Sequence, residues 1–277
     1  MNVPPVAARL ADAWGLELGE PFDLTLNWVA PARRDGEEVV LKVGLTRDGH
    51  LAREAAALGA WAGRGAVRLL RADLDRQALL LERALPGTPV ARLVRYDDEA
   101  ATGAAVGVLR RLHAARVPPG VLPLAERIGA FDEHLAHAGH DRFVPRPLVE
   151  RAREVARELL ADRRPAVLLH GDLHHGNVLR AEREDWLAVD PHGVAGEAAY
   201  DAGAWLYNPL PDPGRAVPAL VPRRVEQLAD GLGAPVERVV GWGFVQAVLS
   251  AVWTASDGAR PHDRTLDVAA LLLPRLA

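Results

Sequence analysis

The sequence predicts an α+β protein with two lobes: a small antiparallel sheet carrying one helix, followed by a larger, mainly helical lobe. Two observations indicate this class. Short segments rich in strand-forming residues fill the region from about Phe22 to Glu82. Longer segments with apolar residues at helical spacing dominate the rest of the chain. The Pro- and Gly-rich stretch LPGTP, from Leu85, separates the two patterns, so we divide the chain into residues 1–84 and 85–277.

The first lobe contains three expected strands and one expected helix. The strands are FDLTLNWVAP (22–31), EEVVLKVG (37–44) and ALLLER (78–83). ARRDG, at 32–36, has the composition of a turn between the first two strands. LAREAAALGAWAG, from Leu51, combines good helix formers with apolar residues at helical spacing, so it predicts the helix.

The second lobe begins with three expected helices and continues with a loop and a hairpin. The helices span about 97–115, 124–137 and 147–162. AVLLH (166–170) is then a short apolar strand that leads into the loop GDLHHGN (171–177). The following segments, VLR, AERED and WLAVD, predict a strand, a turn and a returning strand that ends at Asp190.

Composition narrows the function classes. The chain has 277 residues, a formal net charge of −4 and no cysteine, which excludes disulfides, thiolate zinc sites and cysteine nucleophiles. Its basic pairs, such as Arg110-Arg111, are isolated, so we expect no nucleic-acid partner. No uninterrupted run of about 18 apolar residues occurs, and the N-terminus lacks the apolar core of a signal peptide. We therefore expect a cytoplasmic monomer without a membrane partner.

The loop at 171–177 and the end of the hairpin have the spacing of a phosphoryl-transfer site. Transfer of phosphate to a hydroxyl needs a carboxylate for the substrate proton and oxygen ligands for Mg²⁺ on the nucleotide phosphates. In protein kinases the loop reads Asp-Leu-x-x-x-Asn, and the stretch from Asp172 to Asn177 has this spacing. Asp190 stands at the end of the hairpin, where a second metal-binding acid belongs. Three residues thus fit three roles in the expected order.

The first lobe offers an independent test of this hypothesis. Kinases need a strand lysine on the nucleotide phosphates and a helix glutamate paired with it. Lys42 lies within the apolar strand VVLKVG, where an unpaired ammonium would be costly. Glu54 lies in the expected helix, on the stripe that would face the sheet. The backbone of Glu82, Arg83 and Ala84, in LLLERALPG, would then contact the adenine edge.

Together these segments resemble the aminoglycoside phosphotransferases, a family with the protein-kinase-like fold, and most closely its branch of streptomycin 6-phosphotransferases and hydroxyurea phosphotransferases. The resemblance lies in NWVAPARRDGEEVVLKVG, LLLERALPG and LLHGDLHHGNVLRAEREDWLAVDPHGVAGEAAYDAGAWLYNP, and it covers most of residues 26–209. It implies the following roles: catalytic base for Asp172, Mg²⁺ ligation for Asn177 and Asp190, phosphate contact for Lys42 with Glu54, and bracing of the catalytic-loop backbone for Asp201.

The resemblance also implies a function. The first lobe is expected to bind ATP or GTP, and the second to transfer its γ-phosphate, with Mg²⁺, to a hydroxyl of an aminoglycoside such as streptomycin or of hydroxyurea. The nucleotide would lie under the first hairpin, where Gly36 is the only glycine and the Gly-x-Gly-x-x-Gly loop of protein kinases is missing. Streptomycin carries two guanidinium groups, so its site should present acidic or aromatic side chains: Glu197, Asp212, Glu226, Asp257 and Trp205.

Several of these residues have alternative interpretations. His170, His174 and His175 are expected to order the loop through hydrogen bonds rather than to bind metal. His113 is expected to pack within its helix. The aromatic residues divide evenly between an acceptor pocket and the core: Trp205, Tyr207, Trp242 and Trp253.

Three alternative functions also remain. The acceptor would be a different small hydroxyl metabolite in the first. The pairs Asp48/His50 and Asp190/His192 suggest, in the second, a binuclear metallophosphoesterase in which two metal ions activate water. The third is a pseudokinase that binds nucleotide without catalysis, against which the combination of Asp172, Asn177 and Asp190 argues.

Overall fold

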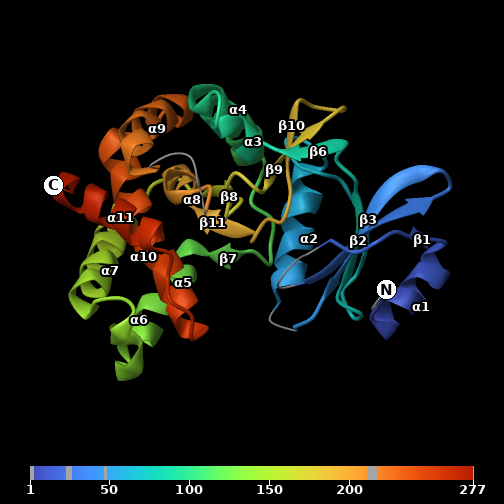
Figure 1. Ribbon diagram of the computed structural model, residues 1–277, viewed down its shortest axis with the longest axis horizontal. Coiled ribbons are helices and arrows are strands. Elements are labelled where there is room, and N and C mark those ends of the chain that lie inside the picture. The colour runs from blue at the N-terminus through green and yellow to red at the C-terminus, as the bar shows by residue number, and fades with distance from the viewer. Residues whose placement is uncertain (1–2, 23–26, 47–48, 211–216, 277) are drawn as a thin grey trace.

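The structure is a computed structural model that describes residues 3–22, 27–46, 49–210 and 217–276. Figure 1 shows a sheet with its helices at one end of the molecule and a larger group of helices at the other. The predicted α+β class and its two lobes are confirmed.

The N-terminal sheet has five antiparallel strands in the order β1-β2-β3-β5-β4. Three of them were predicted, while β1 and β4 were not. The predicted turn at 32–36 is shorter than expected because β2 continues to Arg34, leaving Asp35 and Gly36 as the turn. The strand bounds are β1 (Glu17–Leu18), β2 (Asn27–Arg34), β3 (Glu37–Gly44), β4 (Leu69–Asp73) and β5 (Ala78–Glu82).

A helix covers each face of this sheet. The predicted helix is α2 (His50–Trp61), and α1 (Pro5–Trp14) is an addition that the sequence analysis did not include. Because neighbouring side chains of a strand point to opposite faces, alternate residues of β3, such as Leu41 and Val43, pack in the core under α1. Lys42 therefore points to the other face, the one covered by α2.

A small second sheet connects the lobes. β6 (Pro86–Pro89), within the predicted junction, pairs with β9 (Val178–Ala181), and β9 pairs with β10 (Trp186–Ala188) to form the predicted hairpin. Arg183, in the turn of that hairpin, donates hydrogen bonds to the Glu82 carboxylate and to the carbonyl oxygens of Gly63 and Ala66. The hairpin of the second part of the chain is thus fastened to the first lobe.

The second lobe is mainly helical, as predicted. The helices expected at 97–115 and 147–162 are α4 and α7, but the one expected at 124–137 is interrupted at Gly129, a poor helix former. Its helices are α3 (Ala91–Val94), α4 (Asp98–His113), α5 (Leu124–Ile128), α6 (Ala130–Leu135), α7 (Arg146–Ala161), α8 (Gly203–Tyr207), α9 (Val217–Leu232), α10 (Val236–Ser256) and α11 (Asp263–Leu272), with short 3₁₀ turns at Ala138–Arg142, Ala198–Ala202 and Leu273–Arg275.

Helix α10 forms the centre of this lobe and contacts α7, α8 and α11. It is the one helix of the described residues that is long and apolar enough to cross a membrane, with a mean hydropathy of 1.4. However, 78% of that apolar window is buried inside the protein, as in the core helix of a globular fold.

The catalytic-loop candidate is held by a third small sheet. β11 (Val194–Gly196) pairs with β8 (Val167–Leu169) on one side and with β7 (Leu122–Pro123) on the other. β8 is the predicted strand that leads into the loop at 171–177. The loop therefore leaves a fixed strand end between the two lobes.

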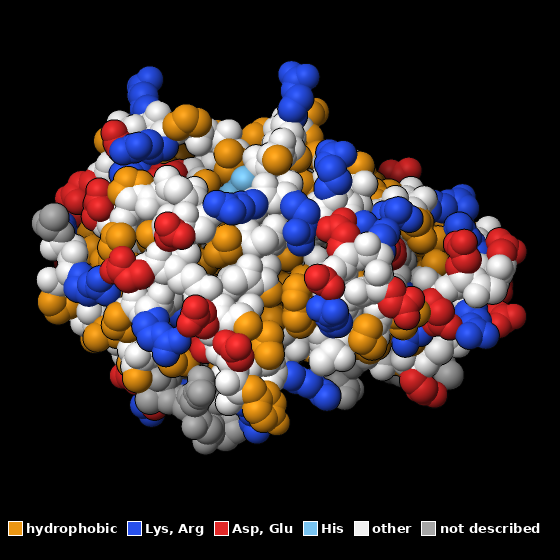
Figure 2. Space-filling view, turned by 90° about the horizontal axis from the view of Figure 1, so that it is seen from above, with side chains coloured by type: hydrophobic (Ala, Val, Ile, Leu, Met, Phe, Trp, Pro, Cys, Tyr) orange, Lys and Arg blue, Asp and Glu red, His pale blue; other side chains and the backbone are white. Residues whose placement is uncertain are grey.

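The face in Figure 2 carries charged side chains of both signs, interspersed across both lobes. Apolar side chains lie between them in small, separate groups, and one histidine is visible near the middle. On this face the described residues form no continuous basic band of the kind that tracks a nucleic-acid backbone.

A buried ion pair joins the helices of the second lobe. Arg224 of α9 is fully buried and donates to the carboxylate of Asp98, at the start of α4, at 2.6 Å. Its other nitrogen donates to the carbonyl oxygens of Trp205 and Asn208. The guanidinium therefore fixes α4, α8 and α9 against one another. Its buried positive charge is compensated by the carboxylate of Asp98.

We predict that Asp98→Asn lowers the free energy of unfolding by about 3 kcal/mol, because it leaves the buried Arg224 without a counter-charge. Urea denaturation measures this. The matched control is Asp97→Asn, one residue earlier, where the side chain caps α4 by accepting from the Ala100 amide at 2.8 Å. Asparagine is an equally good cap, so the control should change stability by less than about 0.5 kcal/mol. Equal effects of the two substitutions would contradict the prediction.

Candidate active site

The loop at 171–177 is held from below by one carboxylate. Asp201 accepts from the backbone N–H groups of His170 at 2.9 Å and Gly171 at 2.8 Å. It also accepts from Nε2 of His113 at 2.9 Å. Burial alone would raise the pKa of Asp201, but the hydrogen bond from His113 and its neighbours outweigh burial and lower that pKa. Asp201 thus braces the loop backbone as a buried anion, the role that the family resemblance of the sequence implied.

His170 and Asn177 fix the two ends of the loop. The Nε2 atom of His170 donates to the Val189 carbonyl at 2.9 Å, and its Nδ1 accepts from the Asp172 amide at 3.3 Å. The side-chain nitrogen of Asn177 donates to the Asp172 carbonyl at 3.1 Å. That bond orients the amide, and its side-chain oxygen accepts no hydrogen bond from the residues that the structure describes.

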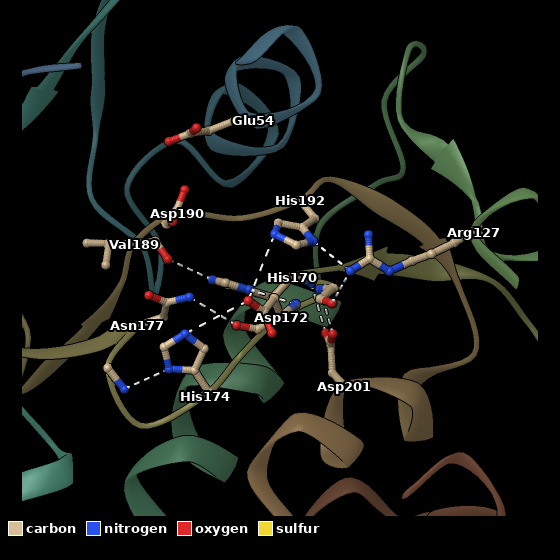
Figure 3. A network of polar contacts seen from close by, with 12 residues as sticks. Glu54, Arg127, His170, Asp172, His174, Asn177, Val189, Asp190, His192 and Asp201 are labelled. Atoms are coloured by element: carbon tan, nitrogen blue, oxygen red, sulfur yellow. Dashed lines mark hydrogen bonds and ion pairs between the residues drawn. The ribbon is translucent and has the colours of Figure 1, made fainter. Parts of the chain in front are cut away.

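The Asp172 side chain stands at the centre of the site (Figure 3) and is 32% exposed. Its Oδ2 atom lies 3.9 Å from Nε2 of His174 and 3.9 Å from Nε2 of His192. Both distances exceed a direct hydrogen bond. The Asp172 carboxylate therefore lies near two histidine nitrogens and is accessible to a ligand.

Lys42 lies between two carboxylates. Its ammonium is 2.5 Å from Oε2 of Glu54 and 2.5 Å from Oδ1 of Asp190. Lys42 is 4% exposed and Glu54 is fully buried, whereas half of the Asp190 side chain is exposed. The predicted strand-to-helix pair is confirmed, and it extends to the acid at the end of the hairpin.

The charges of this cluster sustain one another. Burial by itself would lower the pKa of Lys42, but the attraction of Glu54 and Asp190 outweighs it and raises that pKa. Burial raises the pKa of the Glu54 carboxyl to about 7, against the attraction of Lys42. For Asp190, the ammonium of Lys42 outweighs burial and lowers the pKa. Asp190 thus stays ionised, and its Oδ1 atom contacts Lys42.

Helix α2 is pressed onto the segment after Asp190. A Cβ atom on Gly193 would lie 2.5 Å from the carbonyl oxygen of Arg53, and Gly193 has a φ of 61°, so only glycine fits there. His50, at the start of α2, packs edge-on against His192, with ring centres 4.8 Å apart. These contacts place Glu54, one residue after Arg53, against Lys42.

The adenine-binding segment differs in detail from the prediction. The backbone N–H of Glu82 already donates to the Arg68 carbonyl at 2.9 Å, so it is not available to a nucleotide. Its carboxylate is paired with Arg183. Within the described part of the chain, the backbone groups of Arg83 and Ala84 make no hydrogen bond, while the Arg83 side chain pairs with Glu38. The hinge contact is therefore a prediction for Arg83 and Ala84 alone.

The predicted phosphate cover was assigned to the wrong turn. Lys42 is paired with Val29 in the sheet, so the Asp35-Gly36 turn lies about 17 Å along the strand from it. The end of β2 nearest Lys42 is Asn27, which is preceded by the connection from β1. Part of that connection, residues 23–26, lies outside the described residues. The nucleotide is therefore not expected under the Gly36 turn.

Most of the proposed acceptor residues have other contacts. Glu197 receives bidentate hydrogen bonds from Arg238 and one from Nε1 of Trp242 at 2.8 Å, at the end of β11 away from the loop. Trp205 is buried and donates to Thr102. Neither residue can line an acceptor pocket, because their polar atoms are engaged inside the lobe. Asp257, exposed at the end of α10, stays a prediction.

The remaining aromatic and acidic candidates divide into buried residues of the core and residues at or near the surface. Trp242 is fully buried and Tyr207 nearly so, which assigns both to the interior. Trp253 is only partly buried, and Arg127 stacks over its ring at 4.5 Å. Glu226 lies 3.8 Å from Arg275 on the surface. Asp212 lies outside the described residues.

The histidines are only partly explained by the sequence. His170 and His174 do order the loop, but His175 is buried, stacks on Trp205 at 3.5 Å and has no hydrogen-bond partner for either ring nitrogen within the described ranges. His113 was expected to be a packing residue, yet it bonds to Asp201.

One residue near the loop was missed entirely. Arg127 of α5 donates to Nδ1 of His192 at 2.6 Å (Figure 3). It also donates to the Gly171 carbonyl at 3.1 Å and to the Tyr200 hydroxyl at 2.9 Å. Its partners lie far away in the sequence and no local pattern marks it.

A lysine–glutamate pair on the small lobe, facing an aspartate–asparagine loop on a helical lobe, defines a phosphotransferase with the protein-kinase-like fold. Residues 17–258 match the model of the aminoglycoside/hydroxyurea antibiotic resistance kinases, and the chain belongs to this family.

Two relatives illustrate the range of the family. The streptomycin 6-kinase of Streptomyces glaucescens is 34% identical, over 94% of this chain and 86% of that protein. The hydroxyurea phosphotransferase of Kitasatospora aureofaciens is 37% identical, over 99% of this chain and 80% of that protein.

The fold extends to more distant kinases. A thermostable mutant of aminoglycoside phosphotransferase APH(4)-Ia, in ternary complex with ADP and hygromycin B, superposes with a TM-score of 0.62 at 14% identity, over 97% of this chain and 95% of that one. The family membership replaces the metallophosphoesterase alternative. Of the pair Asp48/His50, Asp48 lies outside the described residues.

We predict that Asp201→Asn destabilises the protein by about 2 kcal/mol, because an amide presents its own N–H donors to a site that holds three donors and needs only acceptors. Urea denaturation measures the change. Asp185→Asn is the control, since Asp185 pairs with Arg180 on the exposed hairpin, with the Asp185 side chain 80% exposed. A destabilisation no larger than that of the control would refute the bracing role of Asp201.

Proposed function

We propose that this protein is a cytoplasmic, Mg²⁺-dependent kinase that transfers the γ-phosphate of ATP or GTP to a hydroxyl of a small acceptor, either an aminoglycoside such as streptomycin or hydroxyurea. The observation that carries the proposal is that Lys42, Asp190, Asn177 and Asp172 lie close together: Lys42 is 2.5 Å from Asp190, and Asn177 donates to the Asp172 carbonyl (Figure 3). Membership of an antibiotic resistance kinase family supports it.

In this proposal Asp172 is the catalytic base. Its carboxylate is the accessible acid of the loop, and it accepts the proton of the acceptor hydroxyl while the hydroxyl oxygen bonds to the γ-phosphorus. The bond from that phosphorus to the bridging oxygen breaks, and the nucleoside diphosphate leaves with the bonding electrons. The hydrogen bond from Asn177 to the Asp172 carbonyl fixes the loop backbone during this exchange.

The residues present fit a magnesium ion. The free side-chain oxygen of Asn177 and the second carboxylate oxygen of Asp190 are hard oxygen donors, the kind that Mg²⁺ prefers. When bound, Mg²⁺ neutralises charge on the nucleotide phosphates. The described residues hold no group of three or more His, Asp or Glu side chains suited to binding a metal by themselves, so the nucleotide would have to complete the shell.

Lys42 would hold the nucleotide phosphates. The two neighbouring carboxylates stabilise the positive charge of its ammonium, and Glu54 keeps it in place. The free backbone groups of Arg83 and Ala84 would receive the adenine or guanine edge, a contact that does not distinguish the two bases through side chains.

One observation favours hydroxyurea among the acceptors. Arg127 lies beside the catalytic loop and, among the described residues, has no carboxylate within ion-pair distance. An unpaired cation next to Asp172 repels a dicationic acceptor such as streptomycin and tolerates a neutral one. Glu197, which was to attract streptomycin, is already neutralised by Arg238.

The purified protein is expected to release ADP from Mg-ATP only when an acceptor is added. The acceptors to be tested are hydroxyurea, streptomycin and other aminoglycosides. Asp172→Ala is the matched control and should lower kcat by about 10²-fold or more, because general-base catalysis contributes 10²–10⁴. Mass spectrometry of the acceptor locates the phosphate. An acceptor-dependent rate in Asp172→Ala equal to that of the parent would remove the base from the scheme.

Asp190→Ala should weaken Mg-nucleotide binding itself, by about tenfold or more, because it deletes a metal ligand rather than a proton acceptor. Isothermal titration with Mg-ATP measures the affinity. Asp172→Ala serves here as the comparison and should bind Mg-ATP nearly as tightly as the parent. Unchanged affinity in Asp190→Ala would contradict its assignment as a ligand.

A further inference from the structure

Two imidazoles point at the same oxygen of Asp172. The nitrogens nearest to Oδ2 are Nε2 of His174 and Nε2 of His192, each at 3.9 Å, and they approach from different segments (Figure 3). The other carboxylate oxygen, Oδ1, has no hydrogen-bond partner among the described residues. The two oxygens of the proposed base are therefore not equivalent.

The opposite nitrogen of each ring is occupied by a group that can only donate. Nδ1 of His174 accepts from the Gly176 amide at 3.0 Å, and Nδ1 of His192 faces the Arg127 guanidinium at 2.6 Å. A backbone N–H group and a guanidinium nitrogen can donate a hydrogen bond but cannot accept one. Each Nδ1 must therefore be unprotonated, and in a neutral ring the single proton then lies on Nε2. Both rings present an N–H to Oδ2.

Arg127 is itself held in one position. Its Nε donates to the Tyr200 hydroxyl, its Nη2 to the Gly171 carbonyl as well as to His192, and its plane lies over the Trp253 ring. The backbone of His192 is tied in turn by its N–H to the His170 carbonyl at 2.8 Å. The ring of His192 is consequently fixed at both its backbone and its Nδ1 side.

We propose that Arg127 and His192 form a positioning relay for Asp172: Arg127 sets the tautomer of His192, and the Nε2–H of His192, together with that of His174, holds Oδ2 so that Oδ1 receives the acceptor proton. Closing the 3.9 Å gap to a hydrogen bond needs a shift of about 1 Å or one bridging water. Orientation of a base at this precision decides rate rather than affinity. The relay rests on the proposed role of Asp172 as base.

The test compares two substitutions at the same position. In His192→Gln, the amide oxygen accepts from Arg127 and the amide nitrogen donates to Asp172, so the relay is preserved. In His192→Leu both bonds are lost at similar volume. We expect the Leu variant to lose about tenfold or more in kcat, with KM for the acceptor and Kd for Mg-ATP within about twofold of the parent. The Gln variant should recover most of that loss.

His137→Gln, on the exposed surface after α6, is the control for the change of residue type, and thermal denaturation checks that all variants fold. Equal kcat values for the Leu and Gln variants would overturn the relay. So would a loss in the Leu variant that falls on KM alone.

A second measurement needs no acceptor. Long-range ¹H–¹⁵N NMR on the full-length protein reports which ring nitrogen of His192 carries the proton. We expect the Nε2–H form in the parent and a mixture of forms in Arg127→Met, where Nδ1 has lost its donor. A parent protein in the Nδ1–H form would overturn the relay. Because this result does not depend on turnover, failure of the relay and failure of the proposed kinase activity are distinguishable.

Discussion

The burial of one ammonium group organises the space between the lobes. Lys42 sits on the face of the sheet that α2 covers, where an isolated charge would cost several kcal/mol. It is stable there only because a carboxylate from α2 and another from the 190–193 segment reach it together. The cation therefore brings three elements from distant parts of the sequence, β3, α2 and the segment at Asp190, together at one point.

The same constraint explains why glycine occupies position 193. For Glu54 to reach Lys42, α2 must lie directly on the segment that follows Asp190, and the Arg53 carbonyl then leaves no space for a side chain opposite it. The loop on the other side is fixed by a different anion, Asp201, which gathers backbone donors that would otherwise be unpaired. The buried ammonium of Lys42 and the buried carboxyl groups of Glu54 and Asp201 thus define the geometry of the candidate site.

The sequence predicted those parts of the fold whose signal is local. Strand formers, helical periodicity and the loop spacing found β3, α2, α4, α7 and the hairpin, and Lys42 stood out because a lysine in an apolar strand needs a partner. It missed the short strands β1 and β4 and the N-terminal helix α1, and it extended a helix through Gly129.

Residues defined by long-range contacts could not be found in this way. Arg127 has its partners in the catalytic loop, at His192 and in the 3₁₀ turn Ala198–Ala202, and His113 meets Asp201 across the lobe. Trp205 and Glu197 failed as acceptor residues for the complementary reason: composition shows that a side chain is aromatic or acidic, but not that Thr102 or Arg238 already engages it.

The central helix of the second lobe has a consequence for how the protein is made. Until α7, α8 and α11 close around it, α10 is a 21-residue apolar segment as hydrophobic as a membrane span. One of these partners, α11, follows α10 in the chain, so the growing chain exposes this segment at least until α11 has been synthesised. A chain shortened before α11 would leave the apolar residues of α10 that α11 normally covers open to solvent, and exposed apolar surface of this kind promotes aggregation.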